Sequence, residues 1–271
     1  MFRVRLVFIG VAAVTLLWAS LPARPGAVGE GRHPATDTAQ GTPVLVELFT
    51  SEGCSDCPPA DALLEKLDRY QPVSGADLIV LSEHVDYWDD IGWRDPYSSR
   101  EYTERQGAYA GQFGLGSVYT PQMVIDGHFQ LVGSDESGAI TAIESATKAE
   151  KVPVSVSLTR LKANKMIAVH VGAGQLPASI AAKSVDVWIA MADDSDESYV
   201  RRGENAGRTL KHVAVLRSLT RVGKVNESGD FSRDVVINIT GQNAGSLRAV
   251  AIVQEAPAGR VLGVGSARLS N

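Results

Sequence analysis

The feature that most constrains the fold of this chain is a pair of cysteines between an apolar strand pattern and a helical pattern. Val44–Thr50 is an apolar run of strand length, and Leu78–Leu81 is a second. Between them, four apolar residues recur at helical spacing: Ala60, Leu63, Leu64 and Leu67. Cys54-Ser55-Asp56-Cys57 comes directly before that helix. The pattern predicts a strand–helix–strand unit with both cysteines at the beginning of its helix.

The same alternation continues to about residue 151. A second helix is predicted over 98–113, a hairpin over 123–132 around Asp126-Gly127, and a third helix from Ser134 or Asp135. After Pro153 the chain changes to short alternating strands, of which Val154–Leu158 and Ile167–Val171 form a hairpin across a turn at Ala163-Asn164-Lys165. We therefore expect an α/β domain over 43–151 followed by an all-β sandwich domain over 152–271.

Two polar stretches interrupt these later strands. Asp193–Glu197 is predicted to be a solvated loop. Arg201–Arg208 places three arginines around a turn, which suits either a bound carboxylate or phosphate group or an internal Arg–Glu pair.

The first residues differ in kind from the rest. Arg3 and Arg5 precede an apolar run, Leu6–Trp18, and small residues follow it, which is the plan of a secretory signal peptide over 1–29. A membrane anchor is the competing interpretation, but the run is shorter than the roughly 20 residues that a spanning helix needs. Residues 30–42 have the composition of a flexible linker, and no later segment is predicted to span a membrane. The mature protein is expected to be secreted or periplasmic.

Charge excludes one broad class of partner. The chain has 26 Lys and Arg against 31 Asp and Glu, a net charge of −5, and no cluster of basic residues large enough for nucleic-acid binding. No nucleotide, haem or glutathione signature is visible, so no cofactor is expected.

The cysteines carry the candidate chemistry. In an exported protein, two cysteines in a C-x-x-C motif beside a β–α–β pattern indicate a redox-active disulfide. At a helix N-terminus, Cys54 is the expected attacking thiolate and Cys57 the resolving thiol, while the Asp56 carboxylate opposes ionisation, so the direction of exchange stays open. An inert structural disulfide and a copper or zinc site completed by His84 or His128 are the alternatives.

Further residues resemble a known superfamily. The run Leu45–Phe49 leading to the cysteines, and Tyr119-Thr120-Pro121 leading to Met123–Gly127, resemble the thioredoxin superfamily in motif and order. The resemblance implies a thioredoxin-like α/β domain. It also implies a cis Pro121 facing Cys54 and a buried acid, Glu47, behind the second cysteine.

A closer resemblance covers nearly all of the mature chain. The stretches Phe49–Ala60, His84–Trp88 and Tyr119–Gln122 resemble a family of secreted bacterial thioredoxin-like proteins of unknown function. This resemblance implies an extracytoplasmic location and leaves the activity open.

The insertion Val85–Tyr97 is expected to overhang Cys54, since segments after the carboxyl ends of parallel strands surround the ligand site. Its Trp88 and Trp93 either grip a substrate, together with Thr120, or form a small core under the loop. His84 is either a proton donor to the thiolate or a hydrogen-bonded structural residue. The leading hypothesis is thiol–disulfide exchange with protein or peptide thiols; the oligomeric state is not predicted.

Overall fold

The computed structural model describes residues 41–161, 165–177, 184–225, 229–239 and 246–269. The predicted signal peptide, residues 30–40 of the predicted linker, and two residues of the expected turn at 163–165 lie outside the described residues. The elements are β1 (Thr42–Thr50), α1 (Pro58–Tyr70), β2 (Ala76–His84), η1 (Asp86–Trp88), α2 (Arg100–Phe113), β3 (Gln122–Ile125), β4 (Phe129–Val132), α3 (Glu136–Ala146), β5 (Val154–Arg160), β6 (Met166–Ala173), β7 (Val185–Tyr199), β8 (Thr209–Lys224), β9 (Phe231–Asn238), β10 (Leu247–Glu255) and β11 (Val261–Arg268).

The first half has the predicted order of strands and helices. β1 pairs with β2 in parallel and with β3 in antiparallel, and β3 continues into the β4 hairpin. Side chains alternate along β1, so Val44, Val46 and Leu48 pack with the apolar faces of α1 and α3. Leu45 and Phe49 point to the opposite face, where they meet residues of α2. The strand run is therefore apolar because both of its faces are covered.

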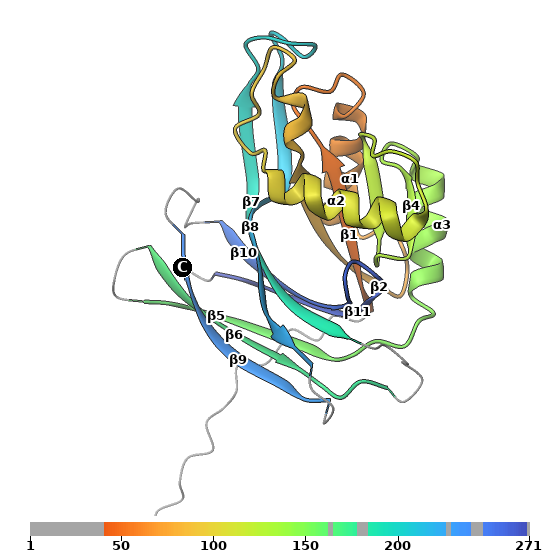
Figure 1. The fold of residues 1–271 in the computed structure, drawn as a ribbon, viewed down its shortest axis with the longest axis vertical. Helices are drawn as coiled ribbons and strands as arrows, with labels where there is room; N and C mark the ends of the chain where they lie inside the picture. The colour runs from red at the N-terminus through yellow and green to blue at the C-terminus, as the bar shows by residue number, and fades with distance from the viewer. Residues whose placement is uncertain (1–40, 162–164, 178–183, 226–228, 240–245, 270–271) are drawn as a thin grey trace, which may run out of the picture. The chain divides into compact units, whose positions relative to one another are not determined.

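The sheet does not end with the first half of the chain. Its eight strands run in the order β11-β10-β7-β8-β2-β1-β3-β4. β8 joins β2 in parallel, with Ser82 opposite Val215, and β7, β10 and β11 follow by antiparallel pairing. Figure 1 shows β7 and β8 continuing the sheet beside the strands of the first half.

The expected fold class, an α/β thioredoxin-like domain followed by an all-β sandwich, is therefore wrong. Four strands from beyond residue 152 extend the first-half sheet into one large mixed sheet, and strands dominate the described chain. The physical reason lies at β2: its outer edge is covered by β8 instead of being left to solvent.

A second, three-stranded sheet has the order β5-β6-β9. The predicted hairpin is confirmed, because β5 and β6 pair in antiparallel from Val154 opposite Ala173 to Arg160 opposite Ile167. Ile167, Val169 and Val171 share a buried cluster with residues of β7 and β10. The small sheet thus covers the part of the large sheet that the helices do not reach.

β7 and β8, with 15 and 16 residues, are longer than the short strands that the pattern predicts after Pro153. The stretch Asp193–Glu197, expected as a loop, belongs to β7 and pairs with β8 as far as Tyr199 opposite Thr209. Asp193 is buried, and from Asp194 onward the residues alternate between partly buried and exposed, which is the pattern of a strand with one face in water. This hairpin brings its connecting residues to the cysteine loop. Among the described residues, none of the helices has the length and apolar character of a membrane span.

Candidate functional site

The two cysteines form a disulfide in the loop between β1 and α1. The Cα atoms of Cys54 and Cys57 lie 5.4 Å apart, and the N–H of Cys57 donates to the carbonyl of Cys54. Cys57 is the N-cap residue of α1, where its carbonyl accepts the N–H groups of Ala60 and Asp61. The pair therefore lies at the beginning of the helix, where the sequence places it.

The N–H groups expected to stabilise a Cys54 thiolate are largely missing or engaged. Pro58 and Pro59 occupy the first two helical positions and have no N–H. The N–H of Ser55 donates to the carboxylate of Glu204 at 3.0 Å. The helix dipole remains as the anion-stabilising contribution of α1 in this conformation.

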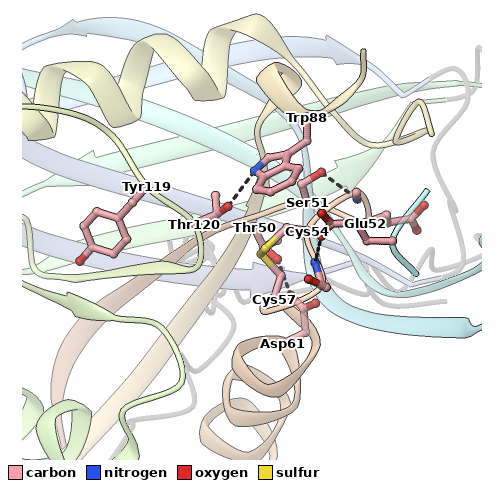
Figure 2. The surroundings of a disulfide bond; sticks show 12 residues. Thr50, Ser51, Glu52, Cys54, Cys57, Asp61, Trp88, Tyr119 and Thr120 are labelled. Atoms are coloured by element: carbon pink, nitrogen blue, oxygen red, sulfur yellow. Dashed lines mark hydrogen bonds between the residues drawn. A yellow bond between two sulfur atoms is a disulfide. The ribbon is translucent and has the colours of Figure 1, made fainter. Parts of the chain in front are cut away.

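Both sulfur-bearing residues are buried. Cys54 is 1% exposed and Cys57 is fully buried. Trp88 lies against Gly53, where an added Cβ would come within 3.1 Å of the Trp88 Cβ. The Trp88 Nε1 donates to the Thr120 hydroxyl at 2.8 Å, and Figure 2 shows both side chains beside the disulfide. A reactant must therefore displace part of the surrounding structure to reach the disulfide.

The connection between β7 and β8, Val200–Arg208, also covers the cysteine loop. Asn205 is fully buried, and its Nδ2 donates to the carbonyls of Glu52 and Cys54 at 2.9 Å each. Arg208 donates to the Asn205 Oδ1 at 2.7 Å. Arg208 of the arginine-rich turn therefore binds the side chain of Asn205, which in turn binds the cysteine loop.

A buried carboxyl group lies next to the disulfide. Asp61 follows Cys57 by one helical turn and accepts a hydrogen bond from the Thr50 hydroxyl at 2.9 Å, as Figure 2 shows. Burial raises the pKa of Asp61, and the nearby His212 and His84 offset this only in part. The raised pKa favours the protonated carboxyl at this position.

Glu52 connects the cysteine loop to both neighbouring segments. Its carboxylate accepts the Trp93 Nε1 at 2.7 Å and the hydroxyl of Ser198 from β7. The His212 Nε2 from β8 lies 3.3 Å from it. One buried carboxylate therefore ties the Val85–Tyr97 insertion and the β7–β8 hairpin to the loop that carries Cys54.

A histidine–aspartate pair completes this buried group. The His84 Nδ1 lies 2.7 Å from the Asp95 Oδ2, and the His84 and His212 rings are 4.6 Å apart. Burial alone would lower the pKa of His84, but the nearby acids, Asp95 above all, outweigh it and raise that pKa. Burial alone would raise the pKa of Asp95, but His84 and two backbone N–H groups lower it. The two shifts favour the charged forms of both side chains, which are closed off from solvent.

Glu47, expected behind the second cysteine, takes part in a different network. Its carboxylate accepts the Arg105 Nε at 2.7 Å and the Tyr109 hydroxyl at 2.6 Å. Burial, reinforced by Glu47, raises the pKa of the neighbouring Glu83, and Arg105 only partly opposes this. The acid of α1 that is nearest in sequence to Cys57 is Asp61.

The other expected residues divide into two groups. The Thr120–Pro121 peptide bond is cis, and Thr120, Trp88 and Trp93 all lie at or beside the cysteine loop. His128 is exposed in the turn between β3 and β4, with its ring 4.6 Å from that of Phe129. In the described ranges, no three His, Cys, Asp or Glu side chains are arranged to hold a metal ion.

Several residues of the site were not predicted: Glu52, Asp61, Glu204, Asn205 and His212. Only Asp61 carries a signal in the local sequence, namely its spacing of four from Cys57 on a helix. Glu52 lies in the cysteine loop itself, but its partners come from distant segments. Glu204, Asn205 and His212 reach the site through pairing between strands distant in sequence.

Two solved structures share this fold over most of the chain. A crystal structure of a protein from Agrobacterium tumefaciens aligns with a TM-score of 0.63 and 26% identity, covering 86% of this chain and 99% of that one. HBP35 of Porphyromonas gingivalis aligns with a TM-score of 0.64 and 14% identity, covering 85% of this chain and 76% of that one, a likeness of fold alone. No curated protein matches the chain.

A family model described as a protein of unknown function, DUF1223, matches residues 45–254. This span contains the disulfide, the Val85–Tyr97 insertion and the β7–β8 connection. The expected membership of a thioredoxin-like family is wrong, because the matched family has no known function and the large mixed sheet departs from that architecture. The chain belongs to the DUF1223 family of proteins of unknown function.

Proposed function

We propose that the Cys54–Cys57 pair exchanges disulfides with thiols of a protein or peptide outside the cytoplasm. The observation that carries the proposal is the position of Asp61, a buried carboxyl group one helical turn from Cys57 whose pKa is raised by burial. A structural role gains little from this disulfide, since a loop of four residues constrains the unfolded chain by only about 2 kcal/mol.

The chemistry starts from the disulfide present in the structure. A substrate thiolate attacks the sulfur of Cys54, the Cys54–Cys57 bond breaks, and its electron pair goes to the sulfur of Cys57. Asp61 donates its proton to that leaving sulfur. A second substrate thiolate then attacks the substrate sulfur of the mixed disulfide and releases Cys54 as a thiolate. The substrate dithiol is oxidised to a disulfide and the cysteine pair is reduced; the reverse sequence reduces a substrate disulfide.

Location supports the same proposal. Disulfides form and persist in the periplasm and outside the cell, and they are rare in the cytosol. The sequence of residues 1–29 has the plan of an export signal, which agrees with this compartment. We therefore propose a secreted or periplasmic protein.

A purely structural disulfide is the second candidate, and the burial of both cysteines favours it. The two functions differ in the reduction potential of the pair. Structural disulfides in secreted proteins lie below about −300 mV, whereas catalytic pairs are more oxidising.

The deciding experiment equilibrates the purified protein with dithiothreitol redox buffers and traps partners with the Cys57→Ala variant. Exchange predicts a potential above about −300 mV and a mixed disulfide through Cys54, with Cys54→Ala as the control that traps nothing. A lower potential together with the absence of any trapped thiol would leave only the structural role.

A further inference from the structure

We propose, on the basis of the exchange function above, that Val200–Arg208 is a lid that occupies the binding position of an extended peptide substrate beside Cys54. "The lid" refers below to these nine residues, which connect β7 to β8. The substrate class is a polypeptide segment whose main chain replaces the contacts that the lid now makes.

The contacts of the lid fall on main-chain groups of the cysteine loop. The Asn205 Nδ2 donates to the carbonyls of Glu52 and Cys54 at 2.9 Å each. The Glu204 Oε2 accepts the N–H of Ser55 at 3.0 Å. Two acceptors and one donor on four consecutive residues of the loop are thus satisfied by side chains from a segment about 150 positions away.

These three groups match what a peptide main chain offers. The side-chain amide of Asn205 is chemically equivalent to a peptide group, and the carboxylate of Glu204 accepts as a peptide carbonyl does. An extended peptide laid along the loop supplies N–H donors and carbonyl acceptors in the same way, as in other cases where strands recognise main chain. If the lid leaves without replacement, water must satisfy these groups, whereas a peptide supplies partners to them directly.

The lid is attached firmly at its base and held weakly at its tip. At the base, the N–H of Gly207 donates to the Val200 carbonyl at 2.8 Å, next to the last pair of the β7–β8 ladder. From Arg201 to Arg208, Asn205 is the one residue that is buried; the others are exposed. Gly203, at φ +79°, fits closely against the Trp93 Cβ, where an added Cβ would come within 3.2 Å. The covered state, in which the lid lies on the cysteine loop, therefore differs by a small number of contacts from an uncovered state without the lid in place.

The covered state also explains the burial of the disulfide. Cys54 is 1% exposed although it begins the segment that leads into α1. The Asn205 amide bonds to the carbonyl of Cys54 itself, so the lid lies directly on the residue that a substrate must reach. Its removal uncovers that residue without disturbing the strands that hold the sheet together.

The test measures access to the disulfide in the full chain. The variants are Glu204→Ala/Asn205→Ala, which removes all three contacts, and Glu204→Ala alone, which changes an exposed side chain and so leaves the fold intact. Arg202→Ala, exposed in the same segment, is the matched control. The readout is the second-order rate of reduction of the disulfide by a water-soluble phosphine, which needs no exchange chemistry from the protein.

We expect the double variant to be reduced about tenfold faster or more than the unchanged protein, Glu204→Ala to be intermediate, and Arg202→Ala to be unchanged. A capped peptide of alanine and serine should slow the reduction of the double variant, whereas serine amide at the same total concentration should not. Equal phosphine rates in all four proteins would overturn the lid. Faster rates without protection by the peptide would overturn the peptide site.

The outcome is separable from that of the proposed function. If the lid variants are reduced faster but no protein in the set exchanges with thiols, the lid stands and the exchange function fails. If exchange occurs at equal rates with and without the lid contacts, the exchange function stands and the lid fails.

Discussion

Asp61 is the side chain on which the proposed chemistry depends most at the scale of single residues. It lies on the first turn of α1 together with Cys57, it is 7% exposed, and burial raises its pKa. Thr50 donates to one carboxyl oxygen, and the other oxygen lies 3.8 Å from the His212 Nδ1. This arrangement places a carboxyl group with a raised pKa one helical turn from the cysteine whose sulfur must leave when the disulfide opens.

We predict that Asp61→Asn slows the opening of the disulfide by dithiothreitol about 10²-fold, the lower range for loss of a general acid. Asparagine keeps the shape and the hydrogen bond to Thr50 but cannot transfer a proton. The rate should be measured in the Glu204→Ala/Asn205→Ala background, so that access does not limit it. Glu65→Gln, on the exposed face of the same helix, is the matched control; an Asp61→Asn rate equal to that control would exclude the carboxyl from the reaction.

The His84–Asp95 pair predicts a pH dependence of stability. The pKa of His84 is raised in the folded protein by Asp95 and the other carboxylates, against the effect of burial. A histidine of this kind stabilises the fold below the pKa of the unfolded chain, about 6.5, and loses that contribution as the pH rises through the folded-state pKa. The free energy of unfolding should therefore decrease from about pH 6.5 upward.

Asp95→Asn should weaken this alkaline decrease, because it removes the charge that holds the proton on His84. Urea unfolding at several pH values measures it. Asp234→Asn is the matched control, since Asp234 lies 2.8 Å from His170 in an exposed pair. A pH profile of Asp95→Asn parallel to that of the unchanged protein would contradict the assigned ion pair.

Single residues also show where prediction from the sequence ends. The place of the cysteines before the helix follows from local spacing. The nearness of Trp88 and Trp93 follows from their position after a parallel strand, and that of Thr120 from the resemblance of its segment to the thioredoxin superfamily. Asp61 appears in the helical pattern as one more polar residue of the outer face. It is buried because His212, which lies 151 positions later in the sequence on β8, covers it. No local pattern contains that information.

At the scale of elements, α1 is the part that its sequence specifies best. Pro58 and Pro59 begin it, Ala60, Leu63, Leu64 and Leu67 are buried as the spacing predicts, and Gln71 ends it in a left-handed conformation. These apolar residues pack on β1 and α3, so the helix fixes the position of Cys57 relative to the sheet.

Truncation of this apolar face should destabilise the protein strongly. Leu67 is fully buried, and Leu67→Ala should lower the free energy of unfolding by about 2–5 kcal/mol through lost burial and a cavity. Tyr70→Ala is the matched control at the end of the same helix, where the side chain is 63% exposed. Its effect should stay within about 0.5 kcal/mol, and equal effects of the two in urea unfolding would contradict the packing described here.

The β7–β8 hairpin is the element that the sequence specifies least. Asp193–Glu197 has the composition of a loop, yet it pairs as strand, because in this stretch the hairpin is covered on one side only. The polar residues that made it look like a loop suit the face in water. The run that follows it, Arg201–Arg208, gives no local sign that Asn205 binds the cysteine loop.

At the scale of the whole molecule, the two halves of the sequence share one sheet and one buried apolar cluster. Leu45, Ile79, Leu81 and Tyr102 from the first half lie in the same cluster as Ala190, Leu216, Val250 and Ile252 from the second. Arg248, 5% exposed, bonds both oxygens of Asp68 on α1 at 2.9 and 3.0 Å. Periodicity predicts each strand separately but not which strand becomes the neighbour of β2, and the expected fold class was wrong for that reason.

This shared core predicts that residues 43–151 do not fold alone. Without β8, the edge of β2 and the side chains of Leu45, Ile79 and Leu81 are exposed to water, which favours aggregation over a stable domain. The mature chain should unfold in urea in one transition, with coincident curves from tryptophan fluorescence and far-UV circular dichroism. The fluorescence reports Trp88 and Trp93 near the disulfide and Trp188 on β7, and the circular dichroism reports all strands. A dispersed amide spectrum and a cooperative transition from the 43–151 fragment would instead show that the cysteine-bearing half is independent, and the shared cluster would then add stability without being required for folding.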